Sequence, residues 1–238
     1  MKPAELMILA GGSGTRIRNL IPGLPKILAP VGNRPFIDYL IRYYTLQGID
    51  RFVFCLGELS ELVMNHLEKH YPEIEKIYVS EDHSLGTGGA IKNGLAQCRD
   101  NTVLVINGDT YYAIQTEKAA AFHHMCGAEC TMILKPMDEV SRYGNVELNG
   151  DYSIKAFSEK GKSGPGLING GAYLLNRRLF LENEYPASFS FEKLYLEQGI
   201  GGRRIFGVKQ DGFFIDIGTP EDYERAQTEI IAYDCRLA

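Results

Sequence analysis

Apolar and polar positions follow two different patterns along the first half of the chain. Residues 6–10 form an unbroken apolar run that stops at glycine, which is typical of a buried strand opening into a loop. Between Pro35 and Gly48, apolar side chains recur every three or four residues, which predicts a helix bounded by the proline and the glycine. The same reasoning predicts strands at 51–56, 76–79, 103–106 and 130–134, and helices at 60–70, 89–97 and 116–126.

The alternation of strand and helix up to about residue 135 predicts an α/β fold. We expect a Rossmann-like, mainly parallel mixed sheet with helices on both faces. Beyond that point Asn149-Gly150-Asp151 lies between two short apolar runs, which is a strong hairpin signal. Residues 168–175 and 204–208 are typical of further strands, and Pro220 opens a terminal helix. The prediction is a single domain, 1–238, with a β-rich insertion.

Length, composition and charge limit the class of protein and the partners that it can bind. The chain has 238 residues, 45% hydrophobic and 23% charged, so it can bury a sizeable core without disulfides. Its net charge of −5 argues against nucleic acid or an anionic membrane as the main partner. No apolar run near the N-terminus is long enough for a membrane helix or a signal peptide, and the five cysteines are irregularly spaced. We expect a cytoplasmic protein with reduced thiols, and the sequence leaves open whether it is a homo-oligomer.

Candidate chemistry begins in the loop after the first predicted strand. The glycines at 11, 12 and 14 let backbone N–H groups approach phosphate oxygens at the carboxyl end of a strand, where open sheets bind ligands. Arg16 can then pair with a triphosphate, and Lys26 can place a compact charge on one phosphoryl group. The loop lacks the Gly-Lys-Ser/Thr ending of a Walker loop, and Ile17 stands where a dinucleotide fingerprint needs glycine. A plain turn before a surface helix would explain the glycines but not Lys26.

Two aspartates follow apolar strands much farther along the chain. Asp109 comes after the run 103–106, and Asp216 ends the run 213–216. Carboxylates at strand ends can face a ligand cleft, and Mg²⁺ prefers one or two carboxylates together with phosphate oxygens and water. Each aspartate alone is more often a turn or a helix cap. Together with the phosphate loop they predict a magnesium site.

These motifs resemble a known family. Residues 9–16, followed by Leu24-Pro25-Lys26 and Asn33-Arg34-Pro35, resemble the signature of the sugar-phosphate nucleotidyltransferases. The resemblance implies the nucleotide-diphospho-sugar transferase fold. Enzymes of this family join a nucleoside triphosphate to a sugar 1-phosphate and release pyrophosphate. The resemblance implies catalytic contacts from Arg16 to the β and γ phosphates and from Lys26 to the α phosphate, with Mg²⁺ on Asp109 and Asp216. It also implies nucleotide contacts from Leu9, Ala10, Gly11, Gly12, Ser13, Gly14, Thr15, Glu81, Gly86, Thr87 and Gly108.

The resemblance also implies that different parts of the domain bind the nucleotide and the sugar. It implies a nucleotide-binding half at about 1–135, a β-rich sugar-binding part at about 136–210, and a final part at about 211–238 with the second metal aspartate and the terminal helix. Short polar groups and exposed backbone suit the directional hydrogen bonds of sugar hydroxyls. The sugar contacts that the resemblance implies are Tyr143, Gly144, Glu159, Lys160, Asn169 and Gly170. Taken alone, Glu159-Lys160 is more often a solvated pair.

The choice of base rests on Glu81. A carboxylate can accept from guanine N1–H and the 2-amino group together, whereas uracil offers one such N–H, so GTP is favoured. The stretches 85–91, 107–111 and 168–171 most resemble the guanylyltransferases of this family that act on D-glycero-D-manno-heptose 1-phosphate. Ser13 and Ile27 depart from that pattern, where leucine and proline or leucine are commoner. The alternatives are a uridylyltransferase acting on N-acetylmuramate 1-phosphate or another hexose 1-phosphate, and a non-catalytic nucleotide-sugar-binding regulator.

Two groups of histidines are weaker candidates for a zinc site. His66 and His70 lie four residues apart on a predicted helix, and His123 and His124 precede Cys126 and Cys130. The first pair lacks the glutamate of a metalloprotease helix, and the second group spans a helix and a buried strand. We therefore expect a solvated helix face and core packing at these positions rather than zinc.

Overall fold

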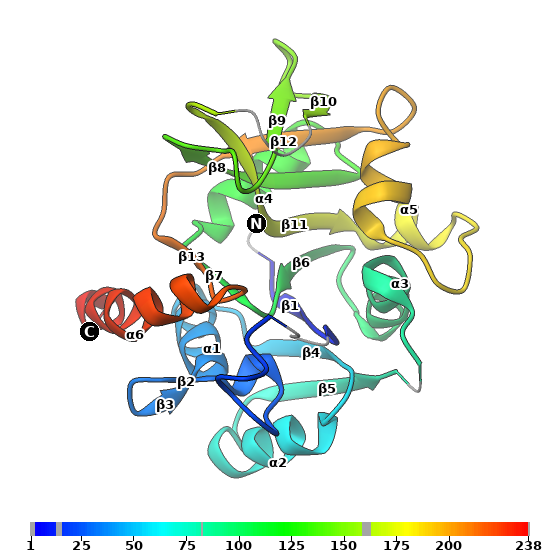
Figure 1. Ribbon diagram of the computed structural model, residues 1–238. Helices are drawn as coiled ribbons and strands as arrows, with labels where there is room; N and C mark the ends of the chain where they lie inside the picture. The colour runs from blue at the N-terminus through cyan, green and yellow to red at the C-terminus, as the bar shows by residue number, and fades with distance from the viewer. Residues whose placement is uncertain (1–2, 13–15, 82, 159–162, 238) are drawn as a thin grey trace.

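The computed structural model describes residues 3–12, 16–81, 83–158 and 163–237. Its centre is a seven-stranded sheet in the order β12-β8-β11-β6-β1-β4-β5 (Figure 1). β11 runs antiparallel to its neighbours β6 and β8, and the other pairs are parallel, which confirms the predicted mixed sheet. The bounds are β1 Glu5–Ala10, β4 Arg51–Leu56, β5 Glu75–Ser80, β6 Thr102–Asn107, β8 Cys130–Met137, β11 Gly166–Asn176 and β12 Ile205–Lys209.

Side chains of β1 alternate between two apolar layers, one on each face of the sheet. Leu6 and Ile8 belong to one layer and Met7 to the other. Because both faces are covered, β1 is apolar at every position after Glu5 instead of alternating with polar residues. One layer receives α1 (Phe36–Leu46), α2 (Ser60–His70), α4 (Thr116–Met125) and α6 (Pro220–Asp234), and the other receives α3 (Gly86–Gln97), α5 (Arg177–Leu181) and the π-helix η2 (Phe191–Glu197).

The helices α5 and η2 have no counterpart among the predicted elements. Each is short and begins at a side-chain cap, because Asn176 Oδ1 accepts from the backbone N–H of Leu179 and Ser190 Oγ accepts from that of Lys193. The ring of Phe180 lies 4.9 Å from that of Tyr195, so aromatic packing rather than helical periodicity holds this region together. Among the described residues, no helix combines the length and the apolar character that crossing a membrane requires.

Three two-stranded ribbons lie outside the main sheet. β9 (Asn145–Leu148) and β10 (Ile154–Ser158) pair antiparallel around the predicted turn, which confirms the hairpin (Figure 1). The other ribbons join β2 (Pro30–Val31) to β3 (Arg34–Pro35), and β7 (Thr110–Tyr112) to β13 (Phe214–Asp216). The short helices η1 (Lys26–Leu28) and η3 (Cys235–Leu237) complete the element order. The region expected as a β-rich insertion also supplies β11 and β12 to the main sheet.

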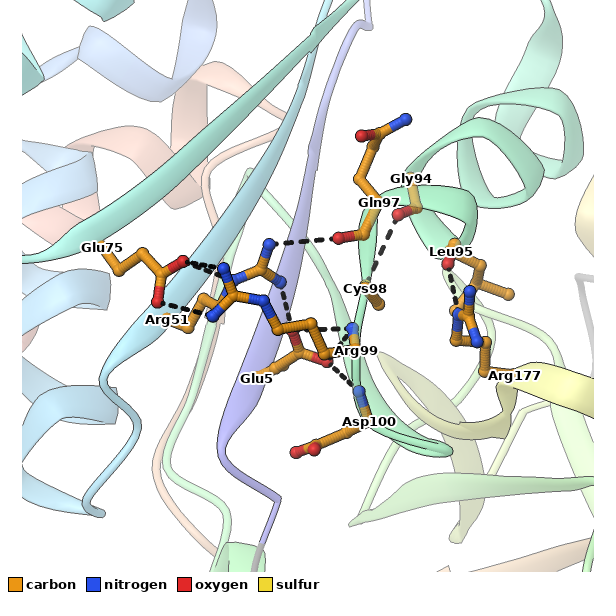
Figure 2. A network of polar contacts seen from close by, with 10 residues as sticks. All are labelled: Glu5, Arg51, Glu75, Gly94, Leu95, Gln97, Cys98, Arg99, Asp100 and Arg177. Atoms are coloured by element: carbon orange, nitrogen blue, oxygen red, sulfur yellow. Dashed lines mark hydrogen bonds and ion pairs between the residues drawn. The ribbon is translucent and has the colours of Figure 1, made fainter.

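A buried ionic network fastens the amino ends of the strands (Figure 2). Glu5 at the start of β1 and Arg51 at the start of β4 are almost fully buried and form an ion pair. Arg51 Nε also donates to Glu75 at 3.0 Å, and Arg51 Nη2 donates to the carbonyl of Gln97 at 3.1 Å. Glu5 Oε2 accepts from the backbone N–H of Arg99 at 2.8 Å, so the network joins β1, β4 and β5 to the end of α3.

We predict that Arg51→Met lowers the free energy of unfolding by about 3 kcal/mol, because it leaves Glu5 buried without its ionic partner. Arg99→Ala is the control, since Arg99 meets Glu75 at the exposed surface and its loss is worth below about 1 kcal/mol. Urea unfolding of both variants measures the difference. A loss at Arg51 no larger than that at Arg99 would contradict the prediction.

His123 is a core histidine. Its Nδ1 lies 2.9 Å from the hydroxyl of Thr131, and its side chain is buried under α4. Burial, with a smaller contribution from neighbouring His124, lowers the pKa of His123 to about 4. Among the residues that the structure describes, no group of three or more histidine, cysteine, aspartate and glutamate side chains could hold a metal ion.

The neutral state of His123 predicts a pH dependence of stability. Between pH 6.5 and about 4 the unfolded chain protonates this histidine and the folded chain does not, so stability falls as the pH falls through that window. The total loss is about 3 kcal/mol, and His123→Gln should remove it. Urea unfolding at pH 7 and pH 4.5 measures the slope. Equal losses in the variant and the unchanged protein would refute the assignment.

Candidate active site

The carboxyl ends of β1 and β6 lie side by side and open into a cavity of about 290 Å³. The backbone N–H of Gly108 donates to the carbonyl of Leu9 at 2.8 Å, which draws the two loops together. A Cβ at residue 108 would lie 2.8 Å from that carbonyl oxygen, so only glycine allows the approach. The cavity is lined by Leu9, Ala10, Gly11, Gly12, Lys26, Ile27, Glu81, Ser84, Gly86, Thr87, Ala90, Asn107, Gly108, Asp109 and Glu192.

Most of the predicted nucleotide-side residues meet in this cavity. The exceptions are Ser13, Gly14 and Thr15, which lie outside the described residues. Arg16 is exposed and does not line the cavity. Burial raises the pKa of Asp216 and the charge of Arg16 partly offsets that rise, so Arg16 lies on the aspartate side of the site. The sequence analysis did not identify the lining residues Ile27, Ser84, Ala90, Asn107 and Glu192.

The two predicted metal aspartates converge although 107 positions separate Asp109 from Asp216. The antiparallel pairing of β7 with β13 sets Asp216 opposite Thr110, and the backbone N–H of Ile217 donates to the carbonyl of Asp109 at 2.9 Å. Burial raises the pKa of Asp216, and the neighbouring charge of Asp109 raises it further. Two carboxylates therefore share one partly dehydrated corner beside the cavity.

Lys26 joins this corner from the other side. It lies at the start of η1, its side chain is only 12% exposed, and its Nζ donates to Asp109 Oδ2 at 2.5 Å. Gly218 gives it room, because a Cβ there would lie 3.2 Å from Lys26 Nζ and 2.7 Å from Asp216 Oδ1. The lysine therefore places one positive charge between the cavity and the two aspartates.

A second wall of the cavity is built where β5 leads into α3. Glu81 Oε2 accepts from the backbone N–H of Leu85 at 3.1 Å, which orients the carboxylate. Gly86 then opens α3 with a φ of 69°, a conformation that side chains rarely adopt. Gly88 packs directly on Phe189, whose ring would lie 2.1 Å from a Cβ at that position. The glycines at 86 and 88 thus let the wall lie against a distant segment.

Four of the predicted sugar-side residues, Tyr143, Gly144, Asn169 and Gly170, are outside the cavity lining. Tyr143 contacts Phe214 of β13 with ring centroids 6.2 Å apart, and burial raises its pKa. Gly144 follows with a φ of 79°. Asn169 Nδ2 donates to the hydroxyl of Tyr173 at 2.6 Å, and Gly170 packs on the ring of Tyr112. Glu159 and Lys160 lie outside the described residues.

A family model for nucleotidyl transferases matches residues 5–232, nearly the whole chain. The chain belongs to the nucleotidyl transferase family. This nucleotidyltransferase is 39% identical over 229 residues to a D-glycero-alpha-D-manno-heptose 1-phosphate guanylyltransferase from Aneurinibacillus thermoaerophilus, covering 96% of this chain and 99% of the relative. A protein of the same name from Campylobacter jejuni is 34% identical over 92% of this chain and 96% of its own.

A solved structure supports the fold of this nucleotidyltransferase. The crystal structure of HddC from Yersinia pseudotuberculosis complexed with GMP-PN aligns with a TM-score of 0.85 at 31% identity, covering 95% of this chain and 98% of that one. The agreement extends to the mixed sheet with helices on both faces, which was expected from the sequence.

Glu192 is the charged lining residue of this nucleotidyltransferase that no motif marks. It comes from the first turn of η2, which the apolar periodicity does not predict. Its Oε2 accepts from the hydroxyl of Thr87 at 2.8 Å and from that of Ser190 at 3.0 Å. Ser190 two positions before an acidic residue is a helix-cap signal in the sequence, but nothing in it points to a cavity 100 positions upstream.

Proposed function

We propose that this nucleotidyltransferase transfers GMP from GTP to D-glycero-alpha-D-manno-heptose 1-phosphate, forming the GDP-sugar and pyrophosphate. The main support is the convergence of Lys26, Asp109 and Asp216 on one end of a cavity whose other wall carries Glu81. The two relatives that bear this activity in their names match almost the full length of the chain. A structural neighbour was crystallised with GMP-PN, which is consistent with a guanine nucleotide.

The reaction needs no nucleophile from the protein. A phosphate oxygen of the sugar 1-phosphate forms a new bond to the α phosphorus of GTP, and the bond to the β phosphate breaks to release pyrophosphate. Both reactants are polyanions, so the work of the site is to align them and to offset charge in the transition state. We assign that work to Lys26 at the α phosphate and to Arg16 at the β and γ phosphates. The backbone of Gly11, Gly12 and the following loop would hold the triphosphate.

We assign Asp109 and Asp216 to a bound Mg²⁺. The raised pKa of Asp216 reflects burial beside a like charge, and a divalent cation would relieve that strain. Two carboxylates are too few to complete the coordination, and phosphate oxygens and water are the further ligands that Mg²⁺ prefers. When bound, the ion would neutralise charge on the phosphates.

The remaining residues are assigned to contacts with the base, the rest of the nucleotide and the sugar. Glu81 would accept from guanine N1–H and the 2-amino group with its two oxygens, one of which also accepts from the backbone N–H of Leu85. Gly86, Thr87 and Gly108 would contact the nucleotide from the cavity wall. We further propose that Tyr143, Gly144, Glu159, Lys160, Asn169 and Gly170 contact the sugar, which would then sit beside β13 and β11.

We predict that Lys26→Ala and Asp109→Ala each lower turnover at least about a hundredfold, because each removes one electrostatic interaction with the transition state worth roughly 3 kcal/mol. Pyrophosphate release measures turnover, and thermal unfolding checks that the fold survives. Lys118→Ala, on the exposed side of α4, is the matched control and should leave turnover unchanged. Near-normal turnover by both site variants would rule out the mechanism.

The substrate assignment is tested by a matrix of GTP, UTP, CTP and dTTP against heptose, mannose, glucose and N-acetylmuramate 1-phosphates. We expect GTP with heptose 1-phosphate to give the highest kcat/KM, by about tenfold or more. A higher value for UTP with N-acetylmuramate or glucose 1-phosphate would replace the proposal by a uridylyltransferase. Nucleotide binding without turnover for every pair would favour a regulator.

A further inference from the structure

Glu192 lines the cavity, and one of its two carboxylate oxygens is held by the protein. The hydroxyls of Thr87 and Ser190 both donate to Oε2. Oε1 makes no hydrogen bond to any residue in the described part of the chain. An ionised carboxylate accepts and does not donate, so the exposed oxygen requires a donor from water or from a ligand.

The segment that carries Glu192 is fastened to the cavity wall. The backbone N–H of Phe189 donates to the carbonyl of Leu85 at 3.0 Å, and that of Gly88 donates back to the carbonyl of Phe189 at 2.9 Å. The backbone N–H of Phe191 donates to the hydroxyl of Thr87 at 2.9 Å, so Thr87 holds both the backbone of η2 and its glutamate. These contacts fix the carboxylate relative to the wall that carries Glu81, and the fixed position makes it suited to recognition.

Glu192 stands between the wall that faces the base and the sugar-side strand β11. On one side it touches Thr87 in the first turn of α3. On the other side the ring of its neighbour Phe191 lies 5.0 Å from that of Tyr173, whose hydroxyl accepts from Asn169. The charge of Glu192 also raises the pKa of Tyr173, second to burial, which agrees with this position.

We propose that Glu192 is a specificity-determining residue that accepts a hydrogen bond from a ring hydroxyl of a bound substrate. The inference rests on the proposed function, because it assumes that nucleotide and sugar 1-phosphate share this cavity. A negative carboxylate repels phosphate, so the phosphate groups are excluded as its partners. Two sources of hydroxyl fit the position between the walls, the ribose of the nucleotide and the pyranose of the sugar 1-phosphate. Either one would lose a charge-assisted hydrogen bond on neutralisation of Glu192.

The experiment uses Glu192→Gln, which keeps the shape of the side chain and removes its charge. Glu197→Gln is the matched control, because Glu197 lies exposed on the same helix and outside the cavity lining. Initial rates of pyrophosphate release are measured with GTP, 2′-deoxy-GTP and 3′-deoxy-GTP, and then with the sugar 1-phosphate varied. Thermal unfolding of both variants confirms that η2 remains folded.

A ribose partner predicts that the unchanged protein prefers GTP to one of the deoxy nucleotides by about tenfold and that Glu192→Gln loses this preference. A pyranose partner predicts that the preference stays and that KM for the sugar 1-phosphate rises about tenfold at little change in kcat. Glu197→Gln should behave as the unchanged protein in both cases. The proposal is overturned if Glu192→Gln leaves every kcat/KM within about twofold, or lowers all of them by one common factor, which is the signature of a structural role.

The substrate matrix is run first, and the Glu192 assay uses whichever pair gives the highest turnover. If that pair is not GTP with heptose 1-phosphate, the proposed function fails while Glu192 is still tested. If the unchanged protein prefers the expected pair and Glu192→Gln discriminates as well as it does, only the role of Glu192 fails. The two failures are therefore distinguishable.

Discussion

The antiparallel contact between β7 and β13 holds two carboxylates next to each other, against their mutual repulsion. Asp109 follows a strand of the main sheet and Asp216 belongs to a strand outside it, so their meeting depends on a few backbone hydrogen bonds between the two segments. Buried like charges cost free energy unless a cation accompanies them. Lys26 supplies one positive charge, with its Nζ 2.5 Å from Asp109 Oδ2.

The main sheet supplies the frame for this arrangement. β1 and β6 are neighbouring parallel strands, so their carboxyl ends emerge at the same edge and bring the glycine loop beside Gly108 and Asp109. The ionic network of Glu5 and Arg51 fastens β1 to β4 and β5 at the opposite end of the sheet (Figure 2). In β1, the ion pair and the cavity residues thus lie at opposite ends of one strand.

The parallel half of the sheet can be predicted from the sequence because its strands are short apolar runs separated by amphipathic helices. The convergence of Asp109 and Asp216 could be expected from their positions after apolar strands, and in the structure Asp216 pairs with Thr110, the residue after Asp109. The strand that carries Asp216 does not belong to the main sheet, because β13 pairs with β7 in a separate two-stranded ribbon. Local patterns do not encode which ribbon an edge segment will join.

Glu192 illustrates what local patterns leave out. Its place in the cavity depends on the packing of Phe189 against Gly88 and on the hydroxyl of Thr87, contacts that join positions about a hundred residues apart. The residues around Glu192 form a short helix whose apolar side chains Phe191, Tyr195 and Leu196 are buried, and only the tertiary fold shows that Glu192 lines the cavity. Glutamates such as Glu81, which follow a strand of the sheet directly, are easier to recognise because the strand itself fixes their edge.

The packing of Gly88 against Phe189 also has a consequence for folding during synthesis of the chain. The glycine loop, Lys26 and Glu81 leave the ribosome well before Phe189 does, yet the first turn of α3 packs on that later segment. A nascent chain that ends short of residue 189 therefore lacks the contact that fixes the start of α3. That end of the helix is completed late in synthesis, although Lys26 and Glu81 are made early.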